Sequence, residues 1–430
     1  MARTMHPSVR GFGLTEVLIA MVIGMITLVI ILQVIASAEG QRRTTSSGSD
    51  ANTSGTLAMQ ALQRDMMDAG FGFSVENPSA PSTFTACFGQ QILAYNSARR
   101  APTTNTLVPN ITLPANAFAP LLIFASNAPP AYLAAADADT DIVQVVYSGS
   151  GSFIGRGVPL LAQGTADNAF AVDIMQTGTR AGLFQGDLVM AAQPARSCVI
   201  SQLTSIGTGG NGQCPGEASV GLDTQMIHTT GSFRNPYSGC NTEATIWNQA
   251  SPNLGVAFDG TLINTPRLYS LGPADRMIFR AYAVRNGRLT SCSPLFQDCT
   301  DAAAWNLAAD GIVSLRAEYG YDADGNGTVA AGEWTRNLPA NPVWARLRAA
   351  RFVIVARSQN AENIQAGAVT TDCTPDWAGA ANNNPTCTGL AQPGEIFLKT
   401  TSDGALWNRY RYKVYETTVP LRNTYWSNNL

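Results

Sequence analysis

The chain has 430 residues, of which 45% are hydrophobic and 13% are charged, and its formal net charge at pH 7 is −3. The small charged fraction, together with 39 glycines and 23 prolines, argues against a coiled coil and against disorder driven by charge. No segment rich in Lys and Arg follows the N-terminal residues, so nucleic acid is not an expected partner.

An apolar stretch near the N-terminus, residues 17–35, is the first predicted element. As a helix it would nearly span the hydrocarbon core of a bilayer, which is about 30 Å thick. Arg3 and Arg10 precede it and would remain on the cytoplasmic side of the membrane. Glu16 stands directly before this stretch, although a carboxylate costs roughly 2.5–3.5 kcal/mol at the centre of a membrane helix. The interpretation of the segment therefore depends on what Glu16 does.

Two ordinary interpretations leave Glu16 without a use. One is a secretory signal peptide cut after the Ala-Ser-Ala triplet of residues 36–38, and the other is a plain membrane anchor. A third is a signal that is cut before the apolar helix. For this interpretation, RGFGLTEV (10–17) resembles the leader of type IV prepilins, in which a basic peptide ends in Gly and the mature chain begins with Phe and has Glu at its fifth position. The usual family form has Thr where this chain has Gly13, and Ile where it has Thr15.

This resemblance implies that a prepilin peptidase cuts between Gly11 and Phe12 and methylates the new amino terminus. Glu16 is then the fifth residue of the mature chain. Its carboxylate would neutralise the amine of Phe12 in its own first turn or on a neighbouring subunit, and it suits the positive end of the helix dipole. Glu16 is therefore expected to fix the register of the subunit in a growing filament.

A second helical part is predicted after the apolar stretch. The glycines at 40, 48 and 55 and many Ser and Thr residues weaken helix propensity at first. The helical period then returns in four apolar residues that share one face: Ala58, Leu62, Met66 and Ala69. We expect one long, interrupted helix over residues 12–70, ending near Gly70 and Gly72. The predicted organisation is a leader (1–11), a transmembrane and filament-core helix (12–38), a second half of the helix (39–75) and a β-rich body (76–430).

The rest of the chain reads as a loop-rich, antiparallel β structure, so the predicted fold class is α+β. Residues 76–130 are expected to be loops, with a short helix possible at 130–137. The predicted strands lie at 141–148, 186–192, 198–206, 275–289, 311–321, 348–358 and 408–423. The Asn-Gly pair at 286–287 predicts a hairpin turn within the fourth of these segments.

Several blocks in this order resemble the PilW family of minor pilins. They are LQRDMMDAGF (62–71), FRAYAVRNGRL (279–289), VSLRAEYGYDADGNG (313–327) and TTVPLRN (417–423). The resemblance implies a structural subunit that primes or caps a type IV pilus near its tip. Its implied partners are other minor pilins, the major pilin, prepilin peptidase, the inner membrane and a possible tip adhesin. The body would be periplasmic before assembly and on the cell-surface pilus afterwards.

Two alternatives stay open at this stage. The leader is shared with the minor pseudopilins of type II secretion systems, so the sequence separates the two assemblies poorly. A calcium-dependent adhesin or ligand-binding module at the pilus tip is the other alternative. Residues 76–130 and 207–265 could carry such a site, and four tryptophans could stack on sugars, although core packing explains them as well: Trp247, Trp305, Trp334 and Trp426.

A calcium-type loop is predicted at residues 322–333, DADGNGTVAAGE. Asp322, Asp324 and Asn326 occupy positions 1, 3 and 5 of the 12-residue EF-hand spacing, with Gly327 at the sharp turn of position 6. Thr328 would offer its main-chain carbonyl, and Glu333 at position 12 could bind through both oxygens. Hard oxygen ligands suit Ca²⁺ rather than Zn²⁺. The residues before this loop are predicted to form a strand, so we expect a structural Ca²⁺ site on a hairpin.

Eight cysteines suit disulfides in an oxidising compartment, and none forms a C-x-x-C pair of the kind found in zinc or thioredoxin-type sites. The close spacings predict three local bridges: Cys292–Cys299, Cys373–Cys387 and Cys198–Cys214.

The two histidines, His6 and His228, bear on catalysis. If the leader is removed, any His-dependent site must use His228, which has no motif around it. The chain has no G-x-S-x-G, H-E-x-x-H or Walker A motif. We therefore expect no enzyme activity.

Overall fold

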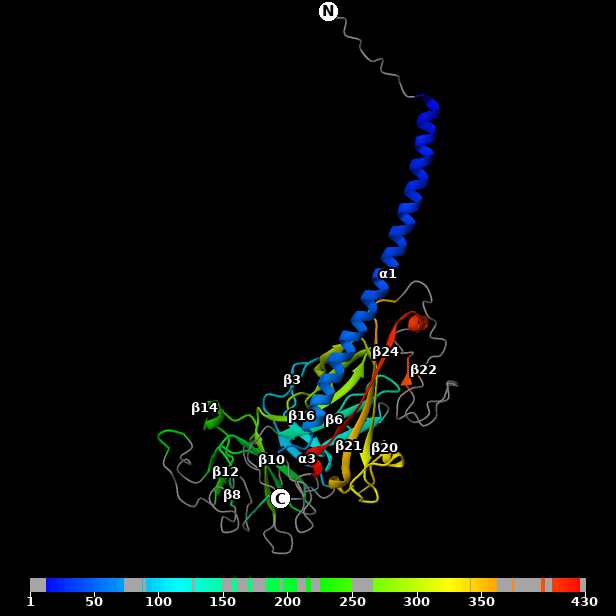
Figure 1. The fold of residues 1–430 in the computed structure, drawn as a ribbon. Helices are drawn as coiled ribbons and strands as arrows, with labels where there is room; N and C mark the ends of the chain where they lie inside the picture. Colours follow the sequence, from blue (N-terminus) through cyan, green and yellow to red (C-terminus); the bar gives the residue numbers. More distant parts are fainter. Residues whose placement is uncertain are drawn as a thin grey trace, which may run out of the picture.

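The computed structural model describes residues 13–72, 87, 90–125, 128–148, 157–160, 169–171, 183–193, 196–206, 214–217, 225–249, 266–340, 342–361, 373–374, 396–398 and 404–425. Figure 1 shows one long helix that lies against a strand-rich body at its C-terminal end and stands clear of it at the other end. The predicted α+β class, a long N-terminal helix on an antiparallel β body, is confirmed.

Helix α1 runs without interruption from Leu14 to Asp68, a span of 55 residues that corresponds to about 82 Å. The predicted interruption is therefore wrong. Some polar residues in the middle of the helix satisfy their hydroxyls within it: Thr53 Oγ1 donates to the Ser49 carbonyl and Thr56 Oγ1 to the Asn52 carbonyl. Packing of the C-terminal half on the body supplies the stability that intrinsic propensity does not.

The C-terminal half of α1 packs mainly on β24 (Tyr412–Pro420) and β21 (Leu347–Arg357). Its buried residues follow the helical period and include the predicted stripe: Ala51, Gly55, Ala58, Leu62, Asp65, Met66 and Ala69. The helix ends at Asp68, and Gly70 follows with a left-handed φ of 80° and donates its N–H to the Val146 carbonyl. The glycines at the end of the pattern thus mark the stop, as predicted.

Two sheets, of five and four strands, lie under α1. The five-stranded sheet has the order β18 (Asn306–Asp310), β17 (Arg288–Cys292), β16 (Met277–Arg285), β6 (Asp141–Ser148) and β5 (Leu121–Ala125). The four-stranded sheet has the order β20 (Trp334–Thr335), β19 (Ile312–Tyr321), β21 and β24. All neighbours in both sheets are antiparallel. Buried residues of α1 and of these sheets belong to one continuous hydrophobic core.

A six-stranded sheet extends the body, with the order β4 (Asn110–Leu113), β1 (Ile92–Tyr95), β10 (Cys198–Gln202), β9 (Asp187–Ala192), β15 (Arg267–Pro273) and β7 (Val158–Pro159). Its β1–β10 pair is parallel.

The remaining strands form four small sheets. They are β11 (Ser205–Ile206), β12 (Gln225–Ile227) and β8 (Ala169–Ala171); β13 (Ser232–Asn235) and β14 (Asn241–Ala244); β2 (Arg100–Ala101) and β3 (Thr106–Leu107); and β22 (Cys373–Thr374) and β23 (Ile396–Phe397). Short helices are η2 (Pro236–Ser238), η4 (Ala302–Ala304), η5 (Ala331–Glu333), η6 (Trp344–Arg346), η7 (Gly404–Arg409) and α3 (Arg422–Tyr425).

Most predicted strands are present, and β6 matches its predicted bounds. The Asn-Gly pair joins β16 to β17, with φ values of 52° at Asn286 and 68° at Gly287. The expectation of loops over 76–130 is wrong for its described part, because β1 to β5 lie there. These strands have two to five residues each, too few for a clear alternation to show. The possible helix at 130–137 is also wrong, because these residues form a turn and extended chain.

Candidate functional site

The N-terminal end of α1 is the first candidate site. Gly11 and Phe12, the predicted processing residues, lie outside the described residues. Glu16 lies in the first turn of α1, and its Oε2 accepts a hydrogen bond of 3.2 Å from the Gly13 N–H. Its side chain is exposed. A carboxylate at the N-terminal end of a helix is favoured by the helix dipole, so this position is stable without a partner from the body.

The segment that follows Glu16 is apolar and exposed. Residues Leu14–Glu39 are long and apolar enough to cross a membrane, and none of this window is buried within the chain. Its large side chains, such as Leu18, Met25 and Ile31, are more than half exposed. Such a surface is stable in a bilayer or against other apolar helices, not in water.

The junction between α1 and the body is organised around a buried carboxylate that the sequence analysis missed. Asp65 Oδ1 accepts a hydrogen bond of 2.9 Å from the Tyr147 hydroxyl. Its Oδ2 accepts from the Tyr282 hydroxyl at 2.7 Å and from an Arg280 guanidinium nitrogen at 3.0 Å. Burial, and then the Asp65 charge, raise the pKa of both tyrosines, so both keep the proton they donate. The sequence did contain a signal for this buried acid, because Asp65 lies on the apolar stripe of the helix between Leu62 and Met66.

The predicted calcium-type loop is the second candidate site, and the structure brings its acids together. One carboxylate oxygen from each of Asp322, Asp324 and Glu333 lies within 4.8 Å of the other two. Asn326 lies among them, because its N–H and its Nδ2 donate to the two oxygens of Asp324 at 3.0 and 2.8 Å. Thr328 donates its N–H and its hydroxyl to Asn326 Oδ1 at 2.8 and 2.6 Å. All five predicted ligand residues therefore belong to one cluster.

The two end residues of this loop are held as carboxylates. Burial alone would raise the pKa of Asp322, but hydrogen bonds from the Gly327 N–H and from Arg348 outweigh it and hold that pKa below its usual value. The Ala330 N–H, followed by the N–H groups of residues 323 and 324, holds the pKa of Glu333 below its usual value. Both groups are ionised at neutral pH, which is the form that binds a cation.

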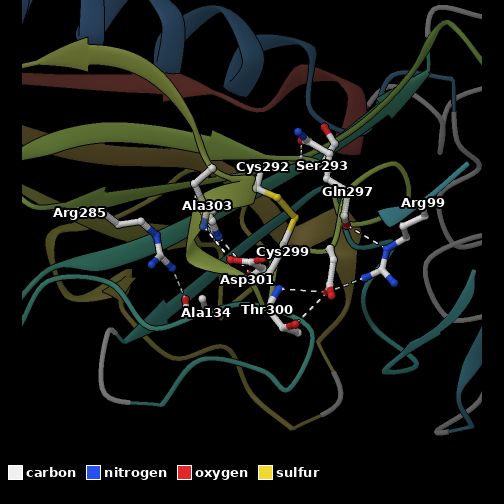
Figure 2. Close-up of a disulfide and its surroundings, with 12 residues drawn as sticks. Arg99, Ala134, Arg285, Cys292, Ser293, Gln297, Cys299, Thr300, Asp301 and Ala303 are labelled. Atoms are coloured by element: carbon white, nitrogen blue, oxygen red, sulfur yellow. Dashed lines mark hydrogen bonds and ion pairs between the residues drawn. A yellow bond between two sulfur atoms is a disulfide. The ribbon is translucent and has the colours of Figure 1, made fainter. Parts of the chain in front are cut away.

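The disulfides agree only in part with the predicted pairs. The Cys292–Cys299 bridge is present, and Figure 2 shows it in the turn that follows β17, where Arg99 donates a hydrogen bond to the Gln297 carbonyl. The predicted Cys198–Cys214 bridge is wrong, because Cys198 is bonded to Cys87 and Cys214 to Cys240. The predicted Cys373–Cys387 pair rests on Cys387, which lies outside the described residues.

The physical reason for the first correction is the parallel β1–β10 pair. Its register, Ile92 opposite Cys198, brings the segment before β1 beside the start of β10. Cys87 and Cys198 therefore have a Cα–Cα distance of 5.6 Å despite a sequence separation of 111 residues. Spacing along the chain cannot reveal such a pair.

The other residues singled out in the sequence are mainly part of the core. Trp247 is 2% exposed and packs edge-on against Phe296. Trp305 is buried, donates its Nε1–H to the Cys299 carbonyl and lies under the Arg285 guanidinium. His228 is buried, and desolvation lowers its pKa to about 4, so it is neutral at physiological pH. Trp426 lies outside the described residues.

Comparison with known proteins supports the resemblance at both ends of the chain. The family model of the Type IV Pilus-assembly protein W matches residues 284–423, and that of the prokaryotic N-terminal methylation motif matches residues 7–32. No match was found among curated proteins or among solved structures. The first match spans β17 to β24 with the calcium-type loop and the Cys292–Cys299 bridge, and the second covers the end of the predicted leader (7–11) and the apolar start of α1. Through these two matches the chain is shown to be similar to the PilW family of prepilin-type minor pilins, which the first family model describes as pilus-assembly proteins.

Proposed function

We propose that this chain is a minor pilin that primes or caps a type IV pilus near its tip. It is inserted in the inner membrane by the apolar half of α1, and prepilin peptidase cuts it between Gly11 and Phe12. It then joins other minor pilins and the major pilin in the filament, and its body lies in the periplasm first and on the cell-surface pilus afterwards.

One observation carries this proposal: none of the apolar window Leu14–Glu39 is buried against the part of the body that the structure describes, and an exposed acid stands at the first turn of α1. A membrane anchor alone would explain the apolar surface but not the acid. Transfer of the helix from the bilayer into a bundle of similar helices explains both the apolar surface and the acid. The apolar side chains would pack on neighbouring helices, and Glu16 would pair with a positive amine there.

The processing step is tested by the mass of the N-terminal peptide, from cells with and without prepilin peptidase. We expect an N-methylated Phe12 at the start of the mature chain only when the peptidase is present. A chain that begins at Glu39 would show that the apolar helix is a discarded signal, and the proposal would then be wrong.

The assembly step is tested with Glu16→Gln, which keeps the shape of the side chain and removes its charge. We expect normal cleavage and normal membrane insertion, but a roughly tenfold lower amount of the subunit in sheared pili, because loss of one buried charge partner costs more than 1.4 kcal/mol. Asp68→Asn, at the exposed C-terminal end of the same helix, is the matched control and should assemble normally. Equal recovery of both variants in pili would remove Glu16 from the assembly mechanism.

The two alternatives differ in their support. The match to a type IV pilus family favours a pilus over a type II secretion system. The calcium-dependent adhesin stays a prediction, and the burial of Trp247 and Trp305 takes away two of the residues that were candidates for sugar stacking.

A further inference from the structure

We propose that the connection between β19 and β20 binds one calcium ion, through the side chains of Asp322, Asp324, Asn326 and Glu333 and the main-chain carbonyl of Thr328. The ion would fix the β19–β20 hairpin. This inference is independent of the pilus role, because it rests on the loop itself.

The loop has the geometry of a shared oxygen site. Asp322 directly follows β19, and Glu333 directly precedes β20, so the two ends of the loop are held by neighbouring strands. Oxygens that bind the same calcium ion at 2.3–2.6 Å lie within about 5 Å of one another. The 4.8 Å limit that contains the three carboxylate oxygens of this loop satisfies that condition.

An unsatisfied oxygen of Asp322 is a second sign that a cation belongs here. This residue is fully buried, and its Oδ2 accepts hydrogen bonds from the Gly327 N–H at 2.8 Å and from Arg348 at 3.1 Å. Its Oδ1 is also buried but accepts no hydrogen bond from any residue that the structure describes. Buried carboxylate oxygens are normally satisfied. Oδ2 accepts the Gly327 N–H, which belongs to the loop. Oδ1 of the same carboxylate therefore also lies beside the loop, where a bound ion would be its partner.

The backbone already has the turn that the site requires. Gly327 has a φ of 92° and Gly325 a φ of 78°, values that L side chains rarely adopt. The sixth position of a calcium loop needs glycine for this sharp turn, and Gly327 occupies that position. The chain therefore presents its acids around one centre without rearranging its main turn.

The surroundings hold the hairpin on which the loop stands. Trp334 lies against Gly320 of β19, where a Cβ would come within 3.1 Å of its ring, and Val329 lies against the same glycine. The Arg351 guanidinium lies 4.5 Å from the centre of the Trp334 ring. Beyond β20, Arg336 is ion-paired with the buried Asp141. Because both flanks are fixed, ordering of the loop by an ion costs little chain entropy.

The ligand set favours calcium over other common cations, with modest affinity. All ligands are oxygens, which argues against zinc. Asp322, Asp324 and Glu333 supply three carboxylates, more than the one or two that magnesium usually takes. Two arginines lower the negative charge of the site: Arg348 contacts Asp322, and Arg346 donates to the Ala323 carbonyl at 2.7 Å. We therefore expect a dissociation constant in the range of extracellular calcium modules, about 10⁻⁴–10⁻³ M.

The test uses the full chain in detergent, titrated with CaCl₂ and, separately, with MgCl₂ up to about 10 mM. We expect one bound calcium by calorimetry and a rise in Tm with calcium that magnesium does not reproduce. Glu333→Gln and Asp324→Asn should each weaken calcium binding at least about tenfold. Asp275→Asn, an exposed acid in another turn of the body, is the matched control and should bind as the wild type does.

A second readout places the ion in this loop even if a variant folds poorly. Terbium replaces calcium at oxygen sites and emits when a nearby tryptophan is excited, and Trp334 is the residue next to Glu333. Sensitised emission should be displaced by calcium and should fall strongly in Trp334→Phe. Absence of calcium binding up to about 10 mM, an equal response to magnesium, or unchanged binding in both ligand variants would each overturn the proposal.

Discussion

The two halves of α1 share one continuous backbone but have opposite surroundings. In residues 14–39 every side chain is exposed, whereas the apolar face of residues 58–69 lies in the core of the body. Within the part of the chain that the structure describes, the first half is held by helix hydrogen bonds and buries none of its surface, whereas the second half is stabilised by tertiary packing. The difference teaches that one helix can carry two separate energetic roles: the first half must find its partners outside the chain, while the second belongs to the fold.

The largest expected effect that separates the halves is that of Leu62→Ala. Leu62 is fully buried, so this change should lower the free energy of unfolding by about 3–5 kcal/mol. The matched control is Leu28→Ala, at a side chain that is 59% exposed, with an expected change of less than about 0.5 kcal/mol. Guanidinium unfolding of the full chain in detergent, followed by tryptophan fluorescence, measures both. Equal losses would mean that the two halves are not independent.

Asp65→Asn is expected to cost about 2–3 kcal/mol of unfolding free energy, because it removes a buried charge that accepts three hydrogen bonds. Asp68→Asn, one turn further and exposed, should have little effect. If Asp65→Asn were neutral, the junction would depend on apolar packing alone, and the distinction between the halves would have to rest on Leu62 and its neighbours.

The pH response also belongs to the body, because residues 17–38 contain no titratable side chain. Burial lowers the pKa of His228 from 6.5 to about 4, so the unfolded chain takes up a proton before the folded one does. The stability associated with His228 is therefore present above pH 6.5 and lost as the pH falls toward 4. The loss between pH 7 and pH 5 should be about 2 kcal/mol. His228→Gln should remove this part of the slope in unfolding curves recorded at several pH values, and an unchanged slope would contradict the assignment.

The smallest expected effect compares two glycines of α1. A Cβ at Gly55 would run into the Tyr415 ring, so Gly55→Ala should cost about 1 kcal/mol net, after the gain in helix propensity. Beyond the helix's own backbone, no described residue has an atom within 4 Å of such a Cβ at Gly48, and Gly48→Ala should stabilise the chain by up to about 1 kcal/mol. Thermal unfolding of the two variants side by side checks the sign of each change, and a gain at both positions would place the boundary of the packed half after Gly55.

The part of the fold that the sequence predicts is the part encoded locally. The alternation of residues 141–148 defines β6, the Asn-Gly pair defines the β16–β17 turn, and the 12-residue spacing from Asp322 to Glu333 defines the acidic loop. Each of these signals needs only a few consecutive residues. The leader and the stripe on α1 are local signals of the same kind.

What the sequence does not predict depends on residues far apart in the chain. Asp65 meets Arg280 across 215 residues, and Cys87 meets Cys198 across 111. At Gly55 of α1 the ring of Tyr415 from β24 packs directly on the helix backbone, so a residue of low helix propensity lies at a tertiary contact. In each case a tertiary contact overrides or adds to the local preference, so no window of neighbouring residues contains the information.

The contact between α1 and β24 has a consequence for the order of folding. Tyr415 and Lys413 both hydrogen-bond to Asn52, across 363 and 361 residues of sequence. The helix leaves the ribosome first, and β24, on which it packs, is among the last segments to be synthesised. During translation, therefore, the part of the helix that packs on β24 stays uncovered while the rest of the body is made. When the N-terminal half of α1 is anchored in a membrane, the C-terminal half is held close to the body as it is made. β24 then has to find a partner whose position is already fixed.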